Sequence, residues 1–252
     1  MIIKKYQKYK RKLKTLRLRI FDPKRINELK GERVVFTHLK KCGFLDNFEN
    51  KRILEIGPKH GKDSFLLATL KPKELILIDL PSKRSKVDEW FPQLNSILNS
   101  KYIEGNILYL NQNQYEQLEK FDLIWCLGVI YHNIEQVRLL RRLFDLCNFG
   151  GSIVLESSTT RNKKLRNLNV VEIHWPKPFE NIPTVTHHPS RLALKSWLEM
   201  VGFSNVMFRE IYSKVMRRRR VVLTGSKTID SKPYVYYDVN DLNPNYSVGD
   251  AT

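Results

Sequence analysis

The chain has 252 residues, of which 42% are hydrophobic, and a formal net charge of +18. This length and apolar content suit one α/β domain with short additions. The three cysteines lack metal-ligand spacing, which indicates reduced thiols and no metal site. No apolar run approaches the roughly 20 residues of a membrane span, and the N-terminus is too charged for a signal peptide. We therefore expect a cytoplasmic protein.

The positive charge is concentrated in an N-terminal arm, residues 1–41, which holds fifteen Lys and Arg against three acids. Apolar residues from Ile3 to Ile20 recur at helical spacing and leave a basic opposite face. A second helix is expected from Pro23 to about Lys41. The arm is either a helix packed on the domain with a solvated basic face, or a contact for RNA or an acidic membrane surface. The last alternative would make the protein peripheral at the membrane.

After the arm, short apolar runs alternate with helical patterns. Near-continuous apolar strands predict a parallel sheet that is buried on both faces. A long insertion at 157–188 predicts a lid. We expect one domain over 42–227 and a tail over 228–252. The expected strands are 53–56, 75–79, 101–104, 122–127, 152–156, 204–211 and 220–224, and the expected helices are 63–70, 87–98, 115–120, 134–147 and 192–201.

A glycine turn joins the first strand to the first helix of this pattern. Glu55 precedes Gly57 and Gly61, and Asp79 ends the next strand, 22 residues after Gly57. Such a turn brings backbone N–H groups and a helix N-terminus towards a ligand. Asp79 is then placed to accept hydrogen bonds from ribose hydroxyls. The pattern predicts a nucleotide-type cofactor.

These residues resemble motif I and the second-strand acid of class I S-adenosylmethionine-dependent methyltransferases, with Lys59 where those enzymes usually have a further glycine. The resemblance implies a doubly wound, mostly parallel, seven-stranded α/β sheet and S-adenosyl-L-methionine as cofactor. It also implies that the amide oxygen of Asn106 meets the adenine amino group, although Asn106 could simply cap a turn. The cofactor-binding residues expected on this basis are Glu55, Gly57, Pro58, Gly61, Asp79, Leu80, Asn106, Ile107, Leu127 and Gly128.

A second stretch, Gly128-Val-Ile-Tyr131-His132, is similar to that of the tRNA wobble-uridine carboxymethyltransferases and their relatives, and the likeness resumes at 189–203. It implies that Gly128 lies against the cofactor and Tyr131 faces the acceptor. His132 is the candidate general base, because imidazole titrates near neutral pH, or else a structural histidine. The connection at 213–220 is shorter than the arginine-bearing segment of those enzymes. We therefore expect unmodified S-adenosylmethionine as the methyl donor. We also expect arginines 217–220 to form a solvated strand edge.

Residues in and beside the insertion suggest a polar or sugar-like acceptor: they are Trp175, His187, His188 and Arg191. The principal expectation is O-methylation of a small polar metabolite or a glycan-linked hydroxyl by direct displacement, with Tyr131 aligning the acceptor and His132 taking its proton. Two alternatives stay open. One is an RNA-modifying methyl- or carboxymethyltransferase, and the other is a non-catalytic, methyltransferase-like binding module.

Overall fold

The computed structural model describes residues 34–213 and 218–228. The helix expected over residues 2–20 and nearly all of the expected tail lie outside these ranges. The expected helix from residue 23 is described only over its last part, α3 (Val34–Lys41). None of the helices within the described ranges is long and apolar enough to cross a membrane.

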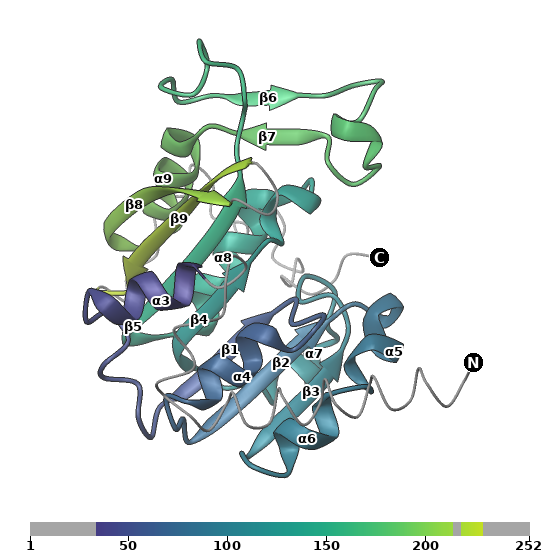
Figure 1. The fold of residues 1–252 in the computed structure, drawn as a ribbon, viewed down its shortest axis with the longest axis vertical. Helices are drawn as coiled ribbons and strands as arrows, with labels where there is room; N and C mark the ends of the chain where they lie inside the picture. Colours follow the sequence, from purple (N-terminus) through teal and green to yellow (C-terminus); the bar gives the residue numbers. More distant parts are fainter. Residues whose placement is uncertain (1–33, 214–217, 229–252) are drawn as a thin grey trace.

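A single large sheet organises the chain (Figure 1). Its first five strands pair in parallel, and the last two form an antiparallel pair beside β5. This doubly wound, mostly parallel sheet is the fold expected from the sequence. In spatial order its strands are β3 (Ser100–Glu104), β2 (Glu74–Asp79), β1 (Arg52–Ile56), β4 (Phe121–Leu127), β5 (Cys147–Ser158), β9 (Arg218–Ser226) and β8 (Ser204–Ser213).

Helices cover both faces of the sheet because alternate residues of each strand point to opposite sides. Leu54 packs into one hydrophobic cluster and its neighbour Ile53 into the other. One face is covered by α3, α4 (Lys62–Ala68), α5 (Arg84–Val87) and α6 (Phe91–Asn95). The other face is covered by α7 (Gln112–Glu116), α8 (Gln136–Leu146) and α9 (Arg191–Met200).

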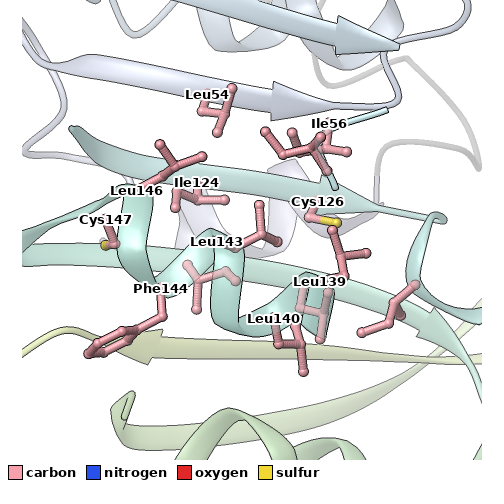
Figure 2. Close-up of a cluster of buried hydrophobic side chains, with 14 of the residues drawn as sticks. Leu54, Ile56, Ile124, Cys126, Leu139, Leu140, Leu143, Phe144, Leu146 and Cys147 are labelled. Atoms are coloured by element: carbon pink, nitrogen blue, oxygen red, sulfur yellow. The ribbon is translucent and has the colours of Figure 1, made fainter. Parts of the chain in front are cut away.

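Helix α8 supplies the largest part of the second face. Figure 2 shows Leu139, Leu140 and Leu143 directed at the central strands, where Ile124 and Cys126 lie. Cys126 is fully buried in this core. This packing holds β4 rigid, and the candidate site residues follow its carboxyl end.

Three expected elements differ from the structure. The helix expected at 115–120 lies earlier, because Asn111 caps it at the start and exchanges hydrogen bonds with Gln114 in a capping box. Gly150 and Gly151 lie inside β5, beside a register irregularity, rather than in a turn before it. Of the helix expected at 87–98, only Val87, the last residue of α5, and the residues of α6 are helical, and Pro92 lies in the first turn of α6.

The insertion contains structure of its own. Strands β6 (Val171–Ile173) and β7 (His187–Pro189) pair as a two-stranded ribbon. Figure 1 shows this ribbon at one end of the molecule, beyond the end of β5. Ser190 then caps α9 by accepting a hydrogen bond from the Ala193 N–H at 3.0 Å.

Candidate active site

The carboxyl ends of β1, β2 and β4 lie at one edge of the sheet because these strands are parallel. Open α/β sheets bind ligands at this edge. The glycine turn follows β1, Asp79 ends β2, and the 3-10 helix η2 (Ile130–His132) follows β4. The structure therefore brings together the two motifs that the sequence singled out.

Both motif glycines are required by the shape of the turn. Gly57 and Gly61 have φ values of 76° and 65°, which only glycine adopts readily. A Cβ on Gly57 would lie 2.7 Å from the Val129 side chain, and one on Gly61 would lie within 2.3 Å of the Trp90 ring. The close approach to protein atoms accounts for glycine at both positions, and contact of their main chain with the cofactor stays a prediction.

Asp79 is held in place by the same turn. Its carboxylate accepts hydrogen bonds from the backbone N–H of Lys59 at 2.9 Å and of Leu80 at 2.8 Å. Lys59 has a φ of 38°, which explains why related sequences place a glycine there. Because a carboxylate offers about four acceptor positions, Asp79 keeps capacity for ribose hydroxyls.

We expect Asp79→Ala to weaken S-adenosylmethionine binding about 100-fold, or about 2.7 kcal/mol, because two hydrogen bonds to a charged group are lost. Calorimetric titration with S-adenosylmethionine and S-adenosylhomocysteine measures the change. Glu104→Ala is the matched control, since Glu104 ends the neighbouring strand in register with Asp79. Equal affinity in the Asp79 variant and the wild type would remove Asp79 from the site.

Glu55 lies beneath the turn and is 3% exposed. It accepts a hydrogen bond from the Ser64 hydroxyl at 2.6 Å, which ties β1 to α4. Burial, reinforced by the charge of Asp63, raises the pKa of Glu55 well above its usual range. Its described contact is internal, so a direct role towards the cofactor stays a prediction.

The raised pKa of Glu55 makes stability depend on pH. A carboxyl whose folded pKa exceeds its unfolded pKa stabilises the fold at low pH, and this contribution is lost as pH rises through the folded pKa. We therefore expect Glu55→Gln to match the wild type in acid and to exceed it in free energy of unfolding at alkaline pH. Denaturant titrations across pH measure this difference, and a pH-independent loss of stability would contradict it.

The remaining residues expected to bind the cofactor differ in burial and in hydrogen bonding. The Asn106 amide oxygen accepts from the Leu108 N–H at 3.1 Å, so it does cap a turn, although its second lone pair remains for an adenine amino group. The Ile107 side chain is in the core at 3% exposure, which leaves its main chain for contact. Pro58 is buried and Leu127 is half-buried.

The residues at this edge fit the expected cofactor. Gly128 has a φ of 74°, which favours glycine, and a Cβ built on it would be in van der Waals contact with Arg220, Glu156 and Tyr131 at 3.6 to 3.9 Å. Leu80, beside Asp79, is 44% exposed and presents an apolar surface suited to a flat base. A carboxylate for the ribose and an exposed apolar side chain are therefore present together at this edge.

Tyr131 lies against a buried ion pair that the sequence did not predict. Arg220 of β9 pairs with Glu156 of β5 through two hydrogen bonds, one of them 2.6 Å long, and both side chains are less than 10% exposed. The Arg220 guanidinium also donates to the Tyr131 hydroxyl at 3.2 Å and lies 4.8 Å from the centre of its ring. Since the Tyr131 oxygen accepts here, its own O–H is left to donate outward.

The burial of Arg220 corrects the expectation of a solvated arginine edge at that position. Only 4% of its surface is exposed. Glu156 carried a recognisable signal, because it is an acid close to the carboxyl end of a strand, as Glu55 and Asp79 are. Arg220 carried none, since a run of four arginines does not reveal which one faces the sheet edge.

His132 is held by the insertion. Its Nδ1 lies 2.8 Å from the Thr184 hydroxyl, and its ring lies 4.2 Å from that of Tyr131. When Nδ1–H donates to Thr184, Nε2 carries the lone pair that a general base needs. Partial burial, together with the positive charges of Arg220, Lys59 and Lys83, lowers the pKa of His132 below 6.5. The imidazole is therefore neutral at physiological pH.

The ribbon β6–β7 also packs on η2 through other contacts. His188 is 1% exposed, and its ring lies 4.3 Å from that of Phe179 and 6.4 Å from that of Tyr131. Gln136 donates to the carbonyls of Ile130 and His187, at 3.2 and 3.3 Å, and so joins η2 to β7. The insertion therefore packs against Tyr131 and His132, and its role as a lid over the acceptor stays a prediction.

The four expected acceptor residues differ in placement. His188 packs at Tyr131, while His187 is half-buried with Nδ1 2.8 Å from the Thr186 hydroxyl. Arg191 pairs with Glu210 of β8 at 2.8 Å and so supports the packing of α9. Trp175 follows β6 and is 78% exposed. A substrate role for each of them stays a prediction, and within the described residues no cluster of three His, Cys, Asp or Glu could hold a metal.

Comparison with known sequences places this geometry in a family. A profile of the family described as methyltransferase domain matches residues 8–207. A tRNA U34 carboxymethyltransferase of Campylobacter jejuni is 30% identical over 160 residues, which is 64% of this chain and 52% of the relative. One of Nautilia profundicola is 28% identical over 162 residues, 64% and 50% of the two chains. The chain spans about half the length of the curated relatives it matches.

Solved structures share the fold at lower identity. The N-terminal domain of EvdMO1 with S-adenosylhomocysteine bound has a TM-score of 0.56 and 20% identity, covering 75% of this chain and 79% of that one. The N-methyltransferase NodS of Bradyrhizobium japonicum, in complex with S-adenosylhomocysteine, has a TM-score of 0.55 and 15% identity, covering 86% and 98%. Because the profile spans most of the chain, this protein belongs to the methyltransferase-domain family, and S-adenosylmethionine is the cofactor of that family.

Proposed function

We propose that the protein transfers a methyl or carboxymethyl group to RNA, with a wobble uridine of tRNA as the acceptor. This replaces the small metabolite or glycan that the sequence alone favoured. The named relatives support an RNA acceptor, and the formal net charge of +18 suits a polyanion. The proposal rests on the arrangement of Tyr131 and His132 in η2, which follows Gly128. Arg220 donates a hydrogen bond to Tyr131, and Thr184 contacts Nδ1 of His132.

The chain's own residues divide the reaction between them. When bound, S-adenosylmethionine supplies an electrophilic carbon on a sulfonium that leaves as a neutral thioether. Asp79 and the main chain at Gly128 hold the donor, and the Tyr131 O–H hydrogen-bonds the incoming group. A hydroxyl oxygen of the wobble nucleotide forms the bond to the transferred carbon as the carbon–sulfur bond breaks, and His132 Nε2 takes the proton of that hydroxyl. The hydrogen bond and ring contact with Arg220 orient Tyr131 in the site.

The position of Arg220 is compatible with use of the carboxylated form of S-adenosylmethionine as the donor. The connection before it is short, which argued for unmodified S-adenosylmethionine, but Arg220 places a guanidinium at Tyr131. A carboxylate on the transferred carbon would there meet a positive group and a phenol donor. Glu156 balances much of this charge, so the two donors must be compared directly.

The test is transfer to unmodified tRNA transcripts with either S-adenosylmethionine or its carboxylated form, followed by mass spectrometry of the nucleosides. We expect a mass increase on the wobble nucleoside that is absent with Asp79→Ala. RNA affinity should fall steeply with salt, because bound phosphates release counterions. Transfer to glycans or small hydroxylated metabolites with none to tRNA, or affinity independent of salt, would contradict the proposal.

A further inference from the structure

Trp175 is the most exposed of the large hydrophobic side chains in the described ranges, at 78%. It follows β6 on the ribbon, two residues after Ile173, which is also 65% exposed. An exposed indole costs solvation free energy, and flat aromatic side chains in the open are typical of surfaces that bind a partner.

The ribbon β6–β7 links Trp175 to η2, which carries Tyr131 and His132. The backbone N–H of His174 donates to the Thr186 carbonyl at 2.8 Å, so Trp175 begins just beyond this cross-strand bond. Thr184, two residues before Thr186, holds His132 Nδ1. Trp175 and Thr184 therefore lie on the same ribbon, each within two residues of the His174–Thr186 hydrogen bond.

The charge around Trp175 suits a polyanion. The insertion, 157–188, contains five basic residues and two acids. Both acids are engaged within the insertion: Glu180 pairs with Arg161 at 2.9 Å, and Glu172 accepts from Thr160. The remaining basic residues include three exposed lysines: Lys163, Lys164 and Lys177.

We propose that Trp175 stacks on an unpaired nucleobase next to the target nucleotide, while the lysines of the insertion contact the flanking phosphates. This inference rests on the proposed RNA acceptor, and it identifies Trp175 as the residue that contacts the single-stranded part of that RNA. Every base offers a π-face to an indole, so the contact holds the strand without selecting its sequence. The same surface would fit loops, whose bases are unstacked, better than a continuous duplex.

The experiment measures the affinity of the full chain for a fluorescent anticodon stem–loop RNA with uridine at the wobble position. Trp175→Ala should weaken binding about 5- to 100-fold, whereas Trp175→Phe, which retains a stacking face, should lose far less. Phe149→Ala is the matched control, because Phe149 is a 68% exposed aromatic near the opposite, amino end of β5. Its RNA affinity should equal that of the wild type.

The possible outcomes separate this inference from the proposed function. Tight RNA binding that Trp175→Ala leaves unchanged overturns the inference alone, and a wild type that binds no RNA overturns both. A Trp175 effect confined to vesicles of phosphatidylcholine and phosphatidylglycerol would assign the surface to lipid instead. Loss of a dimer in Trp175→Ala, measured by light scattering, with RNA affinity unchanged, would assign it to a second copy of the chain.

Discussion

His132→Ala is expected to lower kcat about 100- to 10,000-fold, the usual contribution of a general base, and to leave S-adenosylmethionine affinity unchanged. The reason is that His132 lies on the acceptor side, with Thr184 on its Nδ1 and Tyr131 against its ring. Single-turnover transfer to tRNA, together with calorimetry of the donor, separates the two effects. His38→Ala is the matched control, since His38 lies on α3 and contacts Arg209 of β8.

The pH profile distinguishes a base from a structural histidine. Because the pKa of His132 is lowered, the wild-type rate should rise with pH at values below 6.5 and be level at neutrality. Lys83→Ala removes one of the charges that lower it, so the rising limb should move to higher pH. Thr184→Val should cost about fivefold in rate, from one hydrogen bond, and Thr184→Ser should restore it. Full activity in His132→Ala would remove the base assignment.

Arg220→Met is expected to lower the free energy of unfolding by about 3–5 kcal/mol, because it leaves the Glu156 carboxylate buried without its partner. Both side chains of this pair are less than 10% exposed, and their hydrogen bonds join β9 to β5. Denaturant unfolding measures the loss. An unchanged free energy of unfolding would mean that Glu156 finds water in the variant.

A double variant separates stability from catalysis at this pair. Arg220→Met combined with Glu156→Met should recover most of the lost stability, since a well-packed apolar pair often replaces a buried ion pair at little cost. Group transfer should stay impaired, because Tyr131 has lost the donor that orients its hydroxyl. Recovery of both properties would limit Arg220 to a structural role.

The strands and most of the helices could be predicted because the sequence patterns that indicate them involve residues close together in the chain. Alternation of apolar runs with helical patterns follows from backbone periodicity, and Ser190 could be recognised as a cap from its own position. The helix at α7 was misplaced because its capping box, Asn111 with Gln114, was overlooked in favour of apolar spacing. The ribbon β6–β7 was not predicted, because strands of three residues carry little pattern.

What the sequence by itself determined is the doubly wound sheet, the glycine turn and the acids that end its strands, since each depends on residues close together in the chain. Only the tertiary structure decided the acceptor side. Arg220 reaches Tyr131 across 89 residues and Glu156 across 64, and Thr184 reaches His132 across 52. These contacts depend on the antiparallel register of β9 and on how the ribbon folds back, because strand order and register are set by packing over the whole sheet rather than by any local pattern.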